Sequence, residues 1–184
     1  MTWEEYENLF NNILDGTIND EPYKKEEYLN YVKLNNSRQN RWLKRGKLND
    51  DLLKKVQNLS EAQSWILITE PWCGDASHTS PFIKLVADAS EEIDLTINLR
   101  DGNESIIDDY LTNGTKSIPI LIARDKNGND LFRWGPRPNE SQALFLANKN
   151  DETKSIEDKK VELQNWYNKD KGTSVQEELL ALIK

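Results

Sequence analysis

Residues 65–148 alternate between strand-like and helix-like spacing, and this order constrains the fold more than any other feature of the chain. The apolar, β-branched run Trp65–Thr69 and the alternating segment Ile93–Leu99 both predict strands. Between them, apolar residues recur at helical intervals, namely Phe82, Leu85, Val86 and Ala89. A strand, a helix and a second strand in this order predict two parallel strands joined by a right-handed crossover.

The second half of this region adds a helix and a hairpin. The segment around Glu104–Leu111 is predicted to be a helix, and Ile118–Ala123 a third strand. Asn127-Gly128 is a strong turn signal, so Asp130–Trp134 is predicted to be the returning strand, and a further helix begins near Asn139. The predicted fold class is α/β, with a central mixed four-stranded sheet and helices on both faces.

Helical periodicity dominates both ends of the chain. Residues 1–62 are predicted to form a helical N-terminal extension, which opens with a capping box at Thr2. Residues 150–184 are predicted to form a helical C-terminal extension packed on the domain, with its last helix capped by Ser174. The predicted organisation is therefore one domain over residues 63–149 between two helical extensions.

The charge balance argues against nucleic acid as a partner. The chain has 32 acidic and 24 basic residues, a net charge of -8, whereas phosphate binding needs a concentrated positive face. The local exception is a basic stretch that we expect to be a solvated helix face. It contains Arg38, Arg41, Lys44, Arg45 and Lys47.

The chain lacks the sequence features of export and membrane insertion. Its first fifteen residues carry three glutamates and no unbroken apolar run, and no stretch is long and apolar enough to span a bilayer. With a single cysteine, the chain can form no intramolecular disulfide. We therefore expect a cytoplasmic location and no membrane partner.

That single cysteine, Cys73, follows the first predicted strand closely and lies at the start of a predicted helix. A thiol in this place faces unpaired backbone N–H groups and the positive end of the helix dipole, which stabilise the thiolate. We therefore expect Cys73 to be more nucleophilic than a buried cysteine.

His78 and Arg137 are two further polar side chains near the motif or the predicted rim, and we expect neither to take part in chemistry. His78 lies five residues after Cys73, so it points to a different face of the helix and is expected at the surface. Arg137, which is flanked by prolines, is expected to be an ordinary loop arginine. One cysteine and one histidine cannot complete a zinc shell, so no metal site is predicted.

The segment Trp72-Cys73-Gly74-Asp75-Ala76 resembles the Trp-Cys-Gly-Pro-Cys motif of the thioredoxin family. Pro81 is similar to the proline of that family's active-site helix, Ser117-Ile118-Pro119 to the segment with its cis-proline, and Gly135 to a glycine near the rim. Bacterial thioredoxin-like proteins with Trp-Cys-Gly-Asp motifs are the nearest in pattern. The resemblance implies a thioredoxin-like three-layer fold, with Cys73 as the catalytic residue. The substrate-binding residues that it implies are Trp72, Gly74, Asp75, Ile118 and Pro119.

Two departures from the family pattern restrict the chemistry. Ala76 replaces the second cysteine, so a mixed disulfide at Cys73 has no internal thiol to resolve it, and self-contained dithiol reduction is excluded. Many thioredoxins carry a buried acid on the strand before the motif as a proton acceptor, and this chain has Leu67 at that position instead. Asp75 either takes over as proton acceptor, or favours the helix N-terminus while its charge opposes the thiolate. The sequence leaves both roles open.

Three hypotheses about the function compete on this basis. The first is a monothiol thiol-disulfide oxidoreductase, monomeric or homodimeric, that acts on protein or small-molecule thiols and disulfides. It needs no cofactor, and glutathione or another small thiol serves as co-substrate. The second is a non-catalytic module that binds proteins in the groove between the motif and Pro119. The third is iron-sulfur ligation between two chains with glutathione, as in monothiol glutaredoxins. Their Cys-Gly-Phe-Ser motif is absent here, since Asp75 replaces its aromatic residue, and this counts against the third hypothesis.

Overall fold

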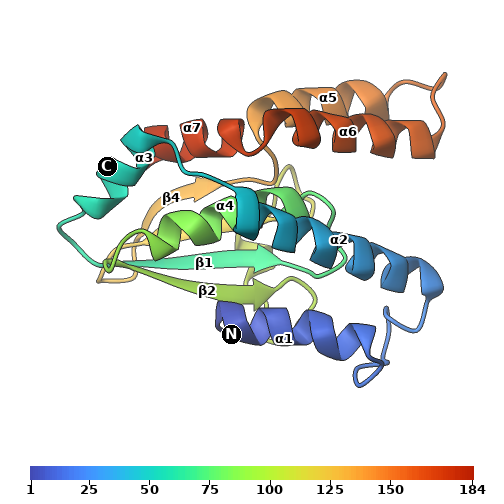
Figure 1. Ribbon diagram of the computed structural model, residues 1–184, viewed down its shortest axis with the longest axis horizontal. Coiled ribbons are helices and arrows are strands. Elements are labelled where there is room, and N and C mark those ends of the chain that lie inside the picture. The colour runs from blue at the N-terminus through green and yellow to red at the C-terminus, as the bar shows by residue number, and fades with distance from the viewer.

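A four-stranded mixed sheet forms the centre of the computed structural model, which describes residues 1–184 (Figure 1). The strands are β1 (Gln63–Thr69), β2 (Ile93–Leu99), β3 (Ile120–Arg124) and β4 (Asp130–Trp134). Their order in the sheet is β2-β1-β3-β4, with β1 parallel to β2 and β3 antiparallel to both β1 and β4. The predicted α/β class and mixed four-stranded sheet are confirmed.

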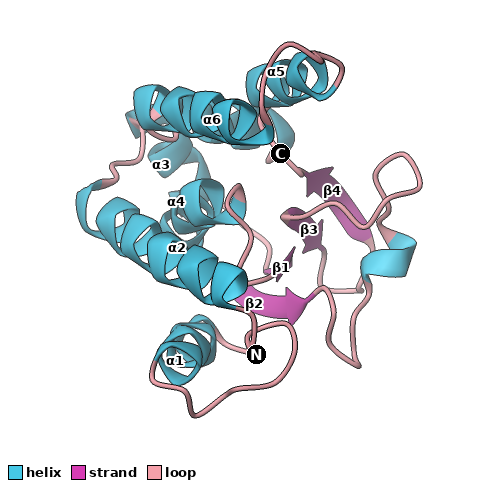
Figure 2. Ribbon diagram, turned by 90° about the vertical axis from the view of Figure 1, so that its right-hand side faces the viewer, coloured by secondary structure: helices cyan, strands magenta, loops and turns pink.

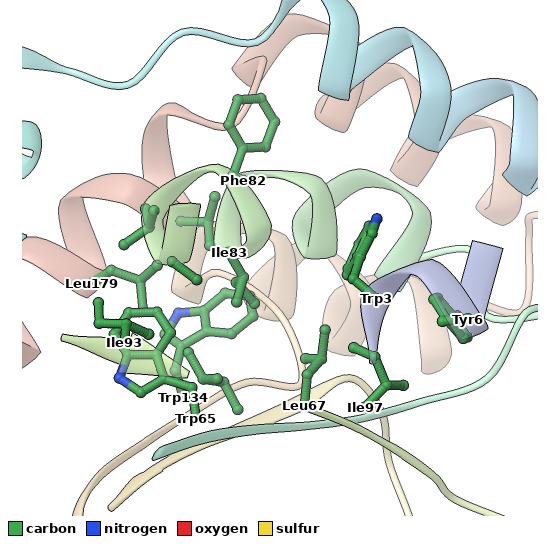
Figure 3. Close-up of a cluster of buried hydrophobic side chains, with 14 of the residues drawn as sticks. Trp3, Tyr6, Trp65, Leu67, Phe82, Ile83, Ile93, Ile97, Trp134 and Leu179 are labelled. Atoms are coloured by element: carbon green, nitrogen blue, oxygen red, sulfur yellow. The ribbon is translucent and has the colours of Figure 1, made fainter. Parts of the chain in front are cut away.

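The larger core lies on the face of the sheet that helix α4 (Ala76–Asp88) covers. In Figure 3, Leu67 and Ile97 project from the sheet toward Trp3, and Phe82 projects from the opposite side of α4. Helix α4 is therefore enclosed by other helices rather than exposed on its outer side. Ten of its residues are buried.

The N-terminal extension supplies three of the enclosing helices. They are α1 (Trp3–Leu14), α2 (Glu26–Arg45) and α3 (Asp50–Gln57). The capping box is confirmed, because the Thr2 hydroxyl accepts from the Glu5 N–H and the Glu5 carboxylate accepts from the Thr2 N–H.

The C-terminal segment forms a helical hairpin and a last helix. Helices α5 (Asn139–Lys149) and α6 (Ile156–Asp170) pack against each other (Figure 2). Helix α7 (Thr173–Leu182) packs on α3 and α4. The predicted cap at Ser174 is wrong. Helix α7 follows Gly172 in the left-handed conformation, and the Ser174 hydroxyl donates to Asp170 one turn earlier.

The predicted helix around Glu104–Leu111 is also wrong, because this segment holds only the short 3-10 helix η1 (Ile107–Asp109). The side chain of Asn98 bonds to the Ile106 N–H and the Glu104 carbonyl, and the Ser105 hydroxyl accepts from the Ile107 N–H. These side chains offer the backbone an alternative to helical hydrogen bonds. Helix η1 and its flanking loops pack on the second face of the sheet in a smaller apolar cluster.

No helix in residues 1–184 has the length and apolar character needed to cross a bilayer.

Candidate active site

Cys73 lies in the turn between β1 and α4, on the second face of the sheet. Its N–H donates to the Glu70 carbonyl at 3.0 Å, and its carbonyl accepts from the Ser77 N–H at 3.2 Å. The Cys73 thiol donates to the Ile118 carbonyl at 3.5 Å, and the Ile118–Pro119 peptide bond is cis. The motif and the third strand therefore meet at the sulfur, although they are far apart in sequence.

The thiol lies at the wall of an open cleft of about 430 Å³. Of the residues predicted for the site, five line this cleft, and Pro119 adjoins it through its cis peptide bond to Ile118. The five are Trp72, Cys73, Gly74, Asp75 and Ile118. The cleft is large enough for part of a small ligand, yet Cys73 itself is only 6% exposed.

Gly135 lies directly against the backbone of Pro119, beside the cleft. It has a φ of +113°, and a Cβ atom built there would lie 2.2 Å from the Pro119 carbonyl oxygen. A side chain at this position would push the β4 end away from the loop that carries the cis peptide bond.

Asp75 is fixed by contacts that come from other parts of the chain. Its carboxylate lies 2.6 Å from the Arg137 guanidinium and accepts a hydrogen bond of 2.9 Å from the Tyr167 hydroxyl of α6. Burial raises the pKa of Asp75, and Arg137 and Tyr167 oppose that rise. The carboxylate makes no capping bond to α4.

Arg137 is therefore not the ordinary loop arginine that the sequence indicated. Its side chain is 13% exposed and bridges the Asp75 carboxylate and the Gln142 amide oxygen, which it contacts at 3.1 Å. The guanidinium also lies over the Phe145 ring at 3.9 Å. The pair of Asp75 and Arg137 has no signal in the sequence, because its partners lie on segments that local periodicity does not relate.

The surroundings of Cys73 reverse the prediction of an activated thiolate. Burial, followed by the negative charge of Asp75, raises the pKa of Cys73 to about 12. The backbone N–H groups of Ala76 and Asp75 and the charge of Arg137 lower it by less. The backbone N–H groups at the helix start favour the thiolate as predicted, but the desolvation of a thiol that the rest of the chain covers outweighs them.

His78 is buried, so the prediction of a surface role is wrong. The indole N–H of Trp42 donates to Nδ1 at 3.1 Å, and Nε2 lies 2.7 Å from the Gln164 amide oxygen. The imidazole also stacks on the Tyr167 ring at 4.7 Å. Because an indole N–H can only donate, Nδ1 accepts and Nε2 carries the proton. Burial lowers the pKa of His78 to about 3, which keeps the ring neutral.

Glu70 is a buried acid that the sequence analysis missed. It directly follows β1, and it accepts hydrogen bonds from the Asp101 N–H at 2.8 Å and the Tyr23 hydroxyl at 3.5 Å. Burial raises the pKa of Glu70 to about 7. Its position three residues before Cys73 was the available signal, but its side-chain hydrogen bonds do not reach the thiol. No group of three or more histidine, cysteine or acidic side chains is arranged to hold a metal ion.

A second hollow of about 610 Å³ adjoins the cleft between α2 and α6. The two cavities share Trp72, Gly74, Asp75 and Arg137. The other walls of the second hollow include the aromatic side chains of Tyr28, Tyr31 and Phe145. The thiol cleft therefore continues into a partly aromatic groove that the two helical extensions help to build.

The fold matches two solved structures of low sequence identity. One is a protein of unknown function from Pseudomonas aeruginosa, with 16% identity, 85% of this chain and 90% of that chain covered, and a TM-score of 0.61. The other is an HIV epitope scaffold, with 17% identity, 100% of this chain and 98% of that chain covered, and a TM-score of 0.59. Among curated proteins, no match was found.

A family model described as thioredoxin matches residues 22–157, from the segment before α2 to the start of α6. The match contains the Cys73 turn, the cis peptide bond at Pro119 and Gly135. Helices α1 and α7 lie outside it. The chain belongs to the thioredoxin family.

Proposed function

We propose that this protein is a monothiol thiol-disulfide oxidoreductase in which Cys73 forms a mixed disulfide that an external thiol resolves. The observation that carries the proposal is the contact between the Cys73 sulfur and the Ile118 carbonyl at the wall of an open cleft. A backbone segment beside the sulfur can pair with an extended substrate, and the cleft gives a disulfide access to it.

The exchange proceeds in two balanced steps. The Cys73 thiol loses its proton to solvent, and the thiolate attacks one sulfur of a disulfide. The sulfur–sulfur bond of the substrate breaks, and the second sulfur leaves as a thiolate. A small external thiolate, such as that of glutathione, then attacks the substrate sulfur of the mixed disulfide. It forms a new disulfide with that sulfur, and Cys73 leaves as a thiolate that takes up a proton from solvent. Ala76 makes this second thiol necessary, because the chain has no other cysteine.

The raised pKa sets the rate of the first step. With a pKa of about 12, roughly one thiol in 10⁴ to 10⁵ is ionised near pH 7.5. Exchange at neutral pH is therefore slow, in contrast to a thiol of lowered pKa.

A direct test is intact-protein mass spectrometry after incubation with oxidised glutathione or 2-hydroxyethyl disulfide at pH 7.5 and pH 9.5. We expect an adduct on Cys73, formed faster at the higher pH and released by reduced glutathione. Cys73→Ser is the control and forms none. The absence of an adduct from both reagents at both pH values would refute the proposal.

One observation favours a non-catalytic binding module instead. The thiol is buried with a raised pKa, while the adjoining groove is partly aromatic and open. In that case, Cys73→Ser keeps its cellular function in a deletion strain with a phenotype. A variant of the groove, Tyr28→Ala, then loses that function. The oxidoreductase proposal expects the reverse for Cys73→Ser.

A further inference from the structure

A third cavity, of about 640 Å³, is separate from the thiol cleft and from the aromatic groove. It lies where α2, α6 and α7 meet. Four of its eleven lining residues are cationic, and none is acidic. The four are Arg41, Arg45, Lys47 and Lys171. In a chain with a net charge of -8, four cations without an acidic residue in one cavity give it a local charge opposite to that of the whole chain. We call it the cationic cavity.

The cations of the cationic cavity are not paired with acidic side chains. None of its four cations takes part in an ion pair. Asp170 lies beside Lys171 in sequence, but its carboxylate accepts from the N–H groups of Gly172 and Ser174 and from the Ser174 hydroxyl. This nearby acid is therefore occupied at the start of α7.

The neutral groups of the cavity also leave donors rather than acceptors available. The side-chain oxygen of Asn49 accepts from the Leu52 N–H, and that of Asn168 accepts from Arg41. The Gln176 oxygen accepts from the Asn49 N–H. Because these oxygens are used within the protein, the amide nitrogens of Asn49 and Asn168 remain free to donate. A lining rich in donors and poor in acceptors suits a ligand that only accepts hydrogen bonds.

The walls of the cavity are held in place. Gln176 bonds to both the Asn49 N–H and the Lys47 carbonyl, which fixes the α2–α3 connection against α7. The Arg41 guanidinium lies over the Trp42 ring at 4.4 Å and donates to Asn168 on α6. A site of this kind loses little conformational freedom when a ligand binds.

We propose that the cationic cavity binds a small molecule that carries two or more phosphate groups. Its size falls in the range of small-molecule sites. Two arginines favour phosphate, because the planar guanidinium can donate two parallel hydrogen bonds to its oxygens. Four unpaired cations match several negative charges better than one.

Tripolyphosphate is a suitable probe, measured by calorimetry and by the amide chemical shifts of the ¹⁵N-labelled protein. We expect one-to-one binding that weakens with added salt and shifts the resonances of residues 45–49 and 171–173. Arg45→Gln combined with Lys47→Gln should weaken binding by about tenfold or more, the effect of removing one or two charge-assisted hydrogen bonds. Both side chains are exposed and unpaired, so the variant should keep the melting temperature of the wild type.

A matched control removes two exposed cations outside this cavity, with Lys24→Gln and Lys33→Gln, and should bind as the wild type does. Equal weakening in the two variants would mean that only net charge matters and would overturn the proposal. So would the absence of binding, equal affinity for citrate, or tighter binding of polyglutamate or an RNA oligonucleotide through the same residues.

Discussion

The guanidinium of Arg137 lies 2.6 Å from the carboxylate of Asp75, so the motif that carries the cysteine is joined to the loop after β4 by a buried ion pair. Tyr167 of α6 donates to the same carboxylate. The charge of Asp75 also raises the pKa of Cys73. One side chain thus stabilises the fold around the cleft and at the same time suppresses the reactivity of the thiol.

Asp75→Asn should therefore change stability and reactivity in opposite senses. Loss of the carboxylate leaves the buried Arg137 guanidinium without its ionic partner, and this cost should exceed the gain from no longer burying the charge of Asp75. The free energy of unfolding should therefore fall by about 1–3 kcal/mol. It also removes the charge that opposes the thiolate. The rate of iodoacetamide alkylation at pH 8 should rise by roughly tenfold, as for a one-unit fall in the pKa of Cys73.

The control for this variant is Asp88→Asn, at the other end of α4. Asp88 pairs with Lys84 in an exposed position, so its loss should cost less than about 1 kcal/mol and leave alkylation unchanged. An Asp75→Asn protein that alkylates no faster than the wild type would contradict the assigned role of the charge.

The wild-type thiol should show no plateau in its reactivity below pH 10. With a pKa of about 12, the alkylation rate of Cys73 should rise about tenfold for each pH unit from 7 to 10. Glutathione, with an ordinary thiol, serves as the reference and should level off near pH 9. A plateau for Cys73 in the same range would show that its thiol is not desolvated.

Glu70→Gln should stabilise the protein at pH 8 but have little effect at pH 4. The pKa of Glu70 rises from 4.5 to about 7 on folding, so the folded state favours the neutral carboxyl. Its stability contribution is present below pH 4.5 and is lost as the pH rises through 7. Glutamine stays neutral and can still accept from the Asp101 N–H.

The gain at pH 8 should be at most about 3 kcal/mol, measured by urea unfolding at both pH values. The quantity to compare is the difference in the free energy of unfolding between wild type and variant as a function of pH. If that difference is the same at pH 4 and pH 8, Glu70 does not have a raised pKa in the folded protein.

Gly172→Ala should be strongly destabilising. Gly172 has a φ of +79°, and a Cβ atom there would lie 2.2 Å from the Phe82 ring. Gly128 has a similar φ of +84° with nothing within 4 Å, so Gly128→Ala isolates the cost of the backbone conformation. That cost is about 1–2 kcal/mol. Thermal unfolding should show Gly172→Ala to be the less stable by a further 1–3 kcal/mol, the range for overpacking a core; equal losses would mean that Phe82 moves aside freely.

Much of the sheet could be predicted from the sequence because each strand has a local signature. The run Trp65–Thr69 is apolar and β-branched, and Asn127-Gly128 identifies the hairpin. The cysteine turn and Pro119 were found by their resemblance to a known motif, and the structure places both at the cleft.

The errors at His78, Arg137 and Cys73 concern interactions between segments that are distant in sequence. Nothing in the spacing around His78 shows that α2 and α6 cover that side of α4. Desolvation of Cys73 has the same origin, because it depends on what the whole chain places around the thiol. The error after β2 is local instead: the side chain of Asn98 bonds to backbone groups six and eight residues later, and apolar periodicity does not report such side-chain hydrogen bonds.

The hydrogen bond from Tyr167 to Asp75 has a consequence for truncation of the chain. Tyr167 of α6 donates a hydrogen bond to Asp75 in the cysteine motif, and its ring also stacks on His78. A thioredoxin core cut from this protein before α6 would lose a partner of Asp75 and one side of the histidine's enclosure. The C-terminal helices therefore help to enclose the turn that carries Cys73, and a core truncated before α6 would lack these contacts.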